Sequence, residues 1–270
     1  MPRSPILLPA LTCMLLAGPA AAQEADPNRE RLEQSPRHHE FVRIDTEAGR
    51  SVRALVVYPE VDRPVPAVVV IHENRGLTDF ERGVADELAE SGYVAIAPDL
   101  LSQTGPNDGD TDSFASGDAA REGIYQLPPE QVTADLDAVV AYGRSLEATT
   151  DKVAVAGFCW GGGQAFRHAT DKPEVAATFV FYGTAPEKEA MKEIGSPVYG
   201  FYGGDDFRIT GQVPEVKQAM EAAGKVYEPV VYEGAGHGFV RAGAMPDADE
   251  ANRRAREQAW ERWKELLGKL

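Results

Sequence analysis

The chain has 270 residues, of which 43% are apolar, and its formal net charge at pH 7 is −16. This length and apolar content suit one large α/β domain. The negative charge argues against nucleic acid or an anionic membrane surface as a partner, because both would repel the chain.

The first 22 residues have the pattern of a secretory signal peptide. Arg3 supplies a short positive region, residues 6–18 an apolar region, and the three alanines at 20–22 a cleavage site. The apolar region is too short to span a bilayer, and no other run of the sequence qualifies. We therefore expect cleavage after Ala22, no stable membrane insertion, and export of the mature chain to the periplasm or the medium.

Cleavage would leave Cys159 as the only cysteine, because Cys13 lies inside the apolar region. A single cysteine cannot form an internal disulfide, which favours a reactive thiol.

The mature chain opens with a polar, charged segment over residues 23–40, which predicts a flexible lead-in to a single domain over 41–270. Residues 41–44 and 53–58 alternate or run apolar on either side of a short polar stretch. They predict an antiparallel hairpin.

Residues 67–71 are all apolar and predict a fully buried central strand. The strand ends at His72, Glu73 and Asn74. Ligands of open α/β sheets bind at the carboxyl ends of parallel strands, so these polar side chains are candidates for a site.

Thr78 and Glu81 form a capping box, which predicts a helix over residues 79–91. A strand over 93–98 follows, and then a loop over 99–129, a length that usually carries function. The aspartates in this loop resemble the start of a calcium site. Ser113 stands where that motif requires glycine, however, so we expect no metal there.

The next feature is a buried strand that runs directly into a nucleophile elbow, with the sequence GFCWG over residues 157–161. So sharp a turn strains the backbone of Cys159 and requires small neighbours two residues away. It also leaves backbone N–H groups free at the start of the following helix, where they stabilise a thiolate or an oxyanion. The alternative is a glycine-rich loop around a buried structural cysteine.

Strands and helices alternate over the rest of the chain, which implies a doubly wound, mostly parallel sheet flanked by helices. The expected helices cover 131–146, 214–223 and 247–267, with a further helix between strands over 177–182 and 197–202, and the last strand covers 226–232.

A cysteine nucleophile requires a base, and the base requires an acid that orients it. Asp205 and Asp206 follow the strand that ends at residue 202, and His237 follows the last strand. Both positions lie at the same edge of the sheet as Cys159. The other histidines fit this role less well; His72, for example, is compatible with a structural role.

With these motifs the chain resembles the dienelactone hydrolase (carboxymethylenebutenolidase-like) family of the α/β-hydrolase superfamily, over about residues 41–267. The resemblance rests on GFCWGG at 157–162, GDD at 204–206, GAGH at 234–237 and the glutamate after the central strand. It implies an α/β-hydrolase fold and a triad of Cys159, Asp206 and His237. Asp206 is preferred because the family's acid follows a Gly-x pair, and Asp205 remains the alternative.

The resemblance also implies roles for residues around the triad. Glu73 would hold the resting thiol and release it when substrate arrives, and the backbone N–H groups of Trp160 and Asn74 would form the oxyanion hole. Arg241 matches an arginine that binds the substrate carboxylate in the family. Gln103 stands where the family has a second arginine, which weakens the case for dienelactone itself as the substrate.

These observations favour an exported cysteine hydrolase that cleaves a small ester or enol-lactone through a thioester, without a metal or organic cofactor. A general carboxylesterase of the same fold is the alternative, and competition by a carboxylate-bearing lactone would separate the two. A non-catalytic binding protein on a hydrolase scaffold is a third reading, which a panel of aryl esters would test. The sequence does not predict an oligomeric state.

Overall fold

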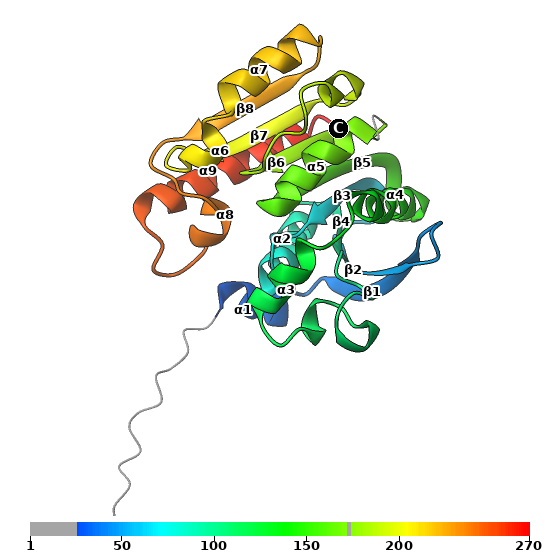
Figure 1. Ribbon diagram of the computed structural model, residues 1–270. Helices are drawn as coiled ribbons and strands as arrows, with labels where there is room; N and C mark the ends of the chain where they lie inside the picture. Colours follow the sequence, from blue (N-terminus) through cyan, green and yellow to red (C-terminus); the bar gives the residue numbers. More distant parts are fainter. Residues whose placement is uncertain (1–25, 172–173) are drawn as a thin grey trace, which may run out of the picture.

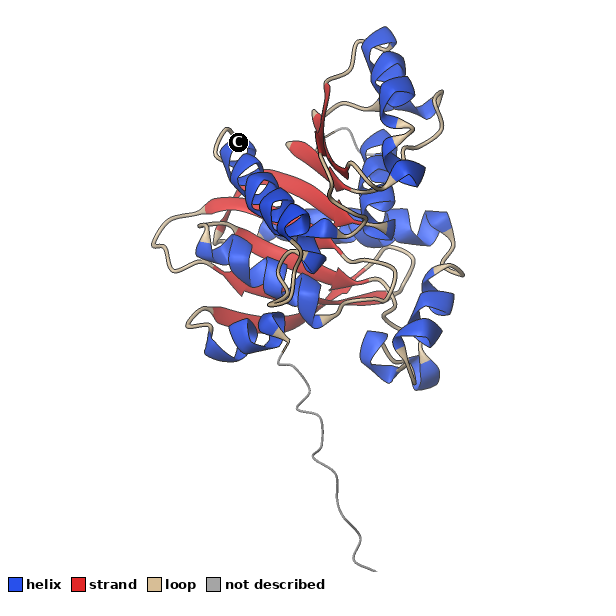
Figure 2. Cartoon of the chain, turned by 90° about the vertical axis from the view of Figure 1, so that its left-hand side faces the viewer, coloured by secondary structure: helices blue, strands red, loops and turns tan. Residues whose placement is uncertain are grey.

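The computed structural model describes residues 26–171 and 174–270. In this part of the chain eight strands form one sheet in the order β1-β2-β4-β3-β5-β6-β7-β8, with helices on both faces (Figures 1 and 2). β2 pairs antiparallel with β1 and β4, and the other neighbours are parallel. The α/β-hydrolase fold expected from the sequence is confirmed, whereas the signal peptide expected over 1–22 lies outside the described residues.

The strands are β1 (His38–Asp45), β2 (Ser51–Tyr58), β3 (Val65–Ile71), β4 (Val94–Asp99), β5 (Thr149–Phe158), β6 (Ala177–Phe181), β7 (Val198–Gly203) and β8 (Tyr227–Tyr232). The helices are α1 (Pro27–Gln34), α2 (Asp79–Glu90), α3 (Gly117–Ile124), α4 (Pro129–Ser145), α5 (Trp160–Asp171), α6 (Phe207–Thr210), α7 (Val213–Ala222), α8 (Phe239–Ala242) and α9 (Glu250–Leu267), with short 3-10 turns η1 (Pro106–Asp108), η2 (Thr111–Ser113) and η3 (Ala190–Glu193).

The central strand β3 contributes to the core on both faces of the sheet. Val68 and Val70 pack on the side of α2 and α9, whereas Val69 and Ile71 pack on the side of α4 and α5. Successive side chains of a strand point to opposite faces, so a strand covered by helices on both sides must be apolar throughout. This is the physical reason for the continuous apolar run that predicted β3.

The antiparallel hairpin and the capping box of α2 are confirmed. The two oxygens of Glu81 accept hydrogen bonds from backbone N–H groups, and Thr78 caps the helix. The helix expected between β6 and β7 is wrong, because that segment forms only the four-residue turn η3. Pro186 and Gly195 flank this segment and leave little room for a regular helix.

The expected loop over 99–129 contains α3 and the turns η1 and η2. Its aspartates contact arginines: Asp110 lies 2.8 Å from Arg53, and Asp112 lies 3.1 Å from Arg82. The carboxylate of Asp99 accepts hydrogen bonds from the backbone N–H and the hydroxyl of Thr111, which fixes the loop to the end of β4.

The lead-in expected to be flexible is structured from residue 27, where α1 begins, and α1 lies against α2 (Figure 1). The reason is the buried carboxylate of Asp86, on α2. This carboxylate accepts hydrogen bonds from Ser35, Arg37 and His39, and it forms an ion pair with Arg31. A hydropathy pattern cannot reveal this contact, because every group that makes it is polar.

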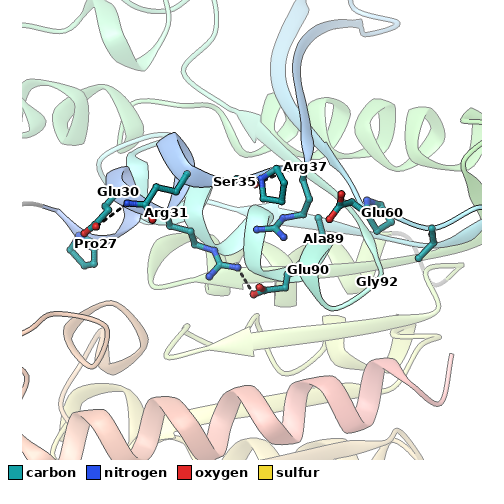
Figure 3. Close-up of a pocket in the computed structure, with 13 residues that line it drawn as sticks. Pro27, Glu30, Arg31, Ser35, Arg37, Glu60, Ala89, Glu90 and Gly92 are labelled. Atoms are coloured by element: carbon teal, nitrogen blue, oxygen red, sulfur yellow. Dashed lines mark hydrogen bonds and ion pairs between the residues drawn. The ribbon is translucent and has the colours of Figure 1, made fainter.

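A cavity of about 800 Å³ lies between α1, the β2–β3 loop and the end of α2. Figure 3 shows Arg31 reaching across it from α1 to Glu90 at the end of α2. The residues that line it include no cysteine and no histidine. It is therefore a large surface cavity without the parts of a covalent active site.

Replacing Asp86 by asparagine should lower the free energy of unfolding by about 3–5 kcal/mol, the usual cost of breaking a buried ion pair from one side. Urea unfolding at pH 7 measures this difference. Asp62→Asn, at an exposed carboxylate of the β2–β3 loop, is the control and should change stability by less than about 0.5 kcal/mol.

The pH dependence of the same difference is a second readout. Burial alone would raise the pKa of Asp86, but hydrogen bonds from Arg37, Ser35 and His39 lower it to about 2. The folded-state pKa is therefore below that of the unfolded chain, so the stabilisation is complete above about pH 4 and disappears as the pH falls towards 2. A difference between parent and variant that stays constant down to pH 2.5 would contradict this account.

Candidate active site

Cys159 lies in the turn between β5 and α5, with a φ of 54°. This left-handed conformation is strained for any residue with a Cβ. A Cβ on Gly157 would collide with the carbonyl of Gly161, and a Cβ on Gly161 would collide with the carbonyls of Ile71 and His72. The strained elbow and its need for small neighbours are thus as the sequence predicted.

The elbow brings Cys159 into line with a histidine and a carboxylate. The thiol Sγ lies 3.1 Å from Nε2 of His237, and Nδ1 of His237 lies 2.5 Å from Oδ2 of Asp206. Asp206 is 7% exposed and lies three residues after the end of β7, whereas its neighbour Asp205 is exposed. Of the two aspartates that the sequence left open, Asp206 is the one that contacts the histidine.

The thiol lies in an environment that disfavours its charge. Burial, reinforced by the negative charge of Glu73, raises the pKa of Cys159 to about 11. A hydrogen bond from the backbone N–H of Trp160 and the positive charges of Arg208 and Arg241 act in the opposite direction. The resting thiol is therefore protonated at neutral pH, and forming the thiolate requires a base.

Glu73, at the end of β3, has both carboxylate oxygens engaged. Oε1 accepts a hydrogen bond from the hydroxyl of Tyr182 at 3.2 Å, and Oε2 accepts one from Nε of Arg241 at 2.9 Å. These contacts link Glu73 to Arg241, while the sulfur of Cys159 faces His237. Glu73 therefore influences the thiol through its charge, whereas the resemblance implied that it would hold the thiol.

Two buried titratable groups, Glu81 and His72, contact the backbone of Glu73, and the sequence pattern predicted only a capping role for Glu81. Oε1 of Glu81 accepts a hydrogen bond from the backbone N–H of Glu73 at 2.8 Å, and burial with the charge of Glu73 raises the pKa of Glu81. Nδ1 of His72 lies 2.7 Å from the Glu73 carbonyl, and Nε2 accepts from the N–H of Leu100 at 3.2 Å. Burial lowers the pKa of His72, so this histidine is a neutral structural group.

Two cavities open next to the thiol. The first, which we call the thiol cavity, has a volume of about 210 Å³ and is lined by Tyr125, Cys159, Trp160, Gln164, Tyr182, Thr184, Arg208, Ile209 and His237. The second, the arginine cavity, has about 590 Å³ and is lined by Glu73, Asn74, Arg75, Thr78, Glu81, Arg121 and Arg241. The side chains of Asn74 and Tyr125 meet across their boundary, at 3.3 Å.

Arg121, Tyr125 and Arg208 are among the lining residues that were not predicted from the sequence. Arg121 and Tyr125 belong to α3 and its end, within a segment expected to be irregular. Arg208 follows the triad carboxylate by two residues, and this nearness to a strand end was the one available signal. No cluster of three or more potential metal ligands occurs in residues 26–171 and 174–270.

Gln103 does not line either cavity, so its expected place in the substrate site is wrong. Its φ of 59° marks a turn after β4, and its side-chain oxygen accepts a hydrogen bond from the backbone N–H of Ser51 at 2.8 Å. The amide therefore holds the start of β2. Trp160, by contrast, begins α5 and lines the thiol cavity, and Asn74 follows β3 by three residues and lines the arginine cavity.

Comparison with known proteins gives a consistent result. The model of the dienelactone hydrolase family matches residues 52–270. The carboxymethylenebutenolidase of Pseudomonas putida is 30% identical over 208 residues, which cover 75% of this chain and 86% of that protein. A protein of Escherichia coli (strain K12) whose name proposes the same activity is 33% identical over 191 residues, covering 66% of this chain and 69% of the relative.

The fold has a solved counterpart in Klebsiella pneumoniae, a protein whose name proposes a dienelactone hydrolase. Its TM-score is 0.76 at 26% sequence identity, and the match covers 87% of this chain and 99% of the other.

The electrostatics of the thiol can be measured directly. The rate of alkylation of Cys159 by iodoacetamide should rise with pH with an apparent pKa near 11, because burial and Glu73 both oppose the thiolate. Glu73→Gln removes the negative charge near the thiol and should lower the apparent pKa of the alkylation reaction. Asp118→Asn, at an exposed carboxylate on α3, is the control and should leave it unchanged. An apparent pKa below 8 in the parent would instead indicate a resting thiolate–imidazolium pair.

Proposed function

This chain belongs to the dienelactone hydrolase family, whose members hydrolyse ester and lactone bonds, and from this premise we propose that it cleaves a small ester or enol-lactone through a thioester on Cys159. The observation that carries the proposal is the continuous contact series from Asp206 through His237 to Cys159. An acid, a base and a nucleophile in this order are the working parts of acyl transfer.

In the first step, Nε2 of His237 takes the thiol proton as the sulfur of Cys159 attacks the substrate carbonyl carbon. A C–S bond forms and the carbonyl oxygen becomes an oxyanion, while Asp206 stabilises the imidazolium through Nδ1. The backbone N–H groups of Trp160 and Asn74 would donate hydrogen bonds to the oxyanion. Collapse breaks the C–O bond, the leaving oxygen takes the proton from His237, and the acyl thioester remains.

The second step releases the acid. His237 takes a proton from a water molecule as the water oxygen attacks the thioester carbonyl, which forms a second oxyanion in the same place. Collapse breaks the C–S bond, and the departing sulfur regains the proton from His237. Neither step requires a metal or an organic cofactor.

Glu73 would keep the thiol in its protonated form between turnovers. Its charge raises the thiol pKa, and a thiol oxidises less readily than a thiolate. That protection is useful to an exported protein. The ion pair with Arg241 in turn holds Glu73 in place, so a substrate carboxylate that binds Arg241 would compete with Glu73 for its guanidinium.

A general carboxylesterase is the second candidate, and one observation favours it. Gln103 is engaged by the backbone of Ser51, so position 103 does not supply the second carboxylate contact known from the family resemblance. The volume of the thiol cavity, about 210 Å³, supports a small acyl group in either case.

We also propose that the chain is exported, to the periplasm or the medium, after cleavage following Ala22. The support is the sequence pattern of residues 1–22, which resembles a signal peptide. None of the helices in the described part of the chain is long and apolar enough to cross a bilayer.

The triad proposal predicts unequal effects of two neighbouring substitutions. Asp206→Asn should lower kcat for aryl esters by on the order of 10³-fold, because His237 loses the partner that orients it. Asp205→Asn, one residue away and exposed, is the matched control and should stay within about threefold of the parent. Cys159→Ala should lose turnover altogether. Equal losses in the two aspartate variants, or turnover by Cys159→Ala within tenfold of the parent, would contradict the mechanism.

Export predicts a shortened mature chain. Expression of the full sequence in a Gram-negative host should yield a protein that begins at Gln23 in the periplasmic or extracellular fraction, identified by intact-mass measurement. A variant with Leu15→Arg, which places a charge inside the apolar region, should remain uncleaved. Recovery of the uncut parent chain from the cytoplasm would contradict export.

A further inference from the structure

Arg208 holds a distinct position in the thiol cavity. Of the described residues that line the cavity, it alone carries a permanent charge, because the others are aromatic, aliphatic, amide, hydroxyl, thiol or imidazole side chains. No aspartate or glutamate lines the cavity to neutralise it. An anionic group that entered the cavity would therefore meet one guanidinium and no competing carboxylate.

Two of the other arginines around the site are paired with carboxylates, and a third, Arg121, lies 5.9 Å from the centre of the Tyr125 ring. Arg241 is paired with Glu73 at 2.9 Å, and Arg75 lies 3.5 Å from Asp118. Within residues 26–171 and 174–270, the side chain of Arg208 makes no hydrogen bond or ion pair. The chain has 43 acidic residues against 27 lysines and arginines, so an arginine without an acidic partner at this position is not explained by a shortage of carboxylates.

Arg208 is also close enough to act on the reacting atom. Its positive charge is one of the influences that favour the thiolate of Cys159. It lies on α6, which directly follows the triad residue Asp206, so the chain segment that orients His237 also fixes the backbone of Arg208. Thr184 and Gln164 line the same cavity and supply neutral hydrogen-bonding groups beside it.

We propose that Arg208 is a specificity-determining residue that binds an anionic group, most simply a carboxylate, on a substrate whose carbonyl lies at Cys159. The inference rests on the proposed hydrolysis and narrows its substrates to acidic esters or lactones. This anion site is separate from Arg241, which lines the other cavity. A carboxylate bound by Arg208 leaves the Glu73–Arg241 ion pair intact.

The test compares two alkylating reagents that differ mainly in charge. Iodoacetate carries a carboxylate and iodoacetamide does not, yet both react with the same thiolate of Cys159. The ratio of their rate constants therefore cancels any change in the thiol pKa, and it reports attraction of the anion alone. Charge-assisted hydrogen bonds are about ten- to a hundredfold effects, so Arg208→Gln should lower the ratio by about tenfold or more.

Two further variants make the comparison specific. Arg208→Lys keeps the positive charge but loses the planar set of N–H donors of the guanidinium. Its rate ratio should lie between those of the parent and of Arg208→Gln. Arg75→Gln removes a neighbouring charge from the arginine cavity and should leave the ratio within about twofold of the parent. Circular dichroism of each variant checks the fold. The side chain of Arg208 is exposed, so its substitution should leave the fold unchanged.

A ratio in Arg208→Gln within twofold of the parent would overturn the proposal, since Arg208 would then affect only the thiol. An equal fall of the rate ratio in Arg75→Gln would overturn the proposal as well, because the anion would then be attracted by the combined positive charge around the site and not by Arg208 in particular. Both measurements are made without hydrolysis, so failure of Arg208 as an anion site is distinguishable from failure of the proposed activity. Where the parent hydrolyses esters, KM for an acidic ester should rise in Arg208→Gln while KM for its neutral analogue stays unchanged.

Discussion

The site depends on one tight passage of the backbone, the turn from β5 into α5. Carbonyl groups of β3 and of α5 itself lie so close to Gly157 and Gly161 that neither position has room for a Cβ. This crowding holds Cys159 in its left-handed conformation, which the surrounding fold must stabilise. The same close approach brings the end of β3, and with it Glu73, near Cys159, so the geometry of the thiol and its electrostatics have a common origin.

The charges around the thiol balance one another. Burial and Glu73 oppose ionisation of Cys159, whereas Trp160, Arg208 and Arg241 favour it. A group that binds one of these arginines therefore alters the balance at the sulfur. In a chain of charge −16, the guanidinium of Arg208 is, among the described residues that line the thiol cavity, the one charge that attracts an anion, although the molecule as a whole repels anions.

The sequence predicted those features that depend on short-range pattern. Apolar runs located the strands of the sheet, and the order of nucleophile, acid and base along the chain located the groups at its edge. Prediction from the sequence failed where a side chain of one segment contacts a segment that is distant in the sequence. Arg208 and Tyr125 reach the thiol cavity only through the packing of α6 and α3, and the side chain of Gln103 is bonded to the backbone of Ser51 instead. The helix α1 was missed because polar contacts with Asp86, and not apolar burial, hold it in place.

At position 159 the fold and the proposed reaction require different residues, because the backbone conformation favours glycine and the reaction uses a thiol. Cysteine and serine, which are both unbranched at Cβ, bear a similar cost of a φ of 54°, on the order of 1–2 kcal/mol, so the turn itself does not distinguish sulfur from oxygen. Glycine would relieve the strain and remove the thiol. Thermal stability and the proposed reaction therefore make opposite demands on this residue, and selection for a more heat-resistant protein alone would favour a sequence without the thiol.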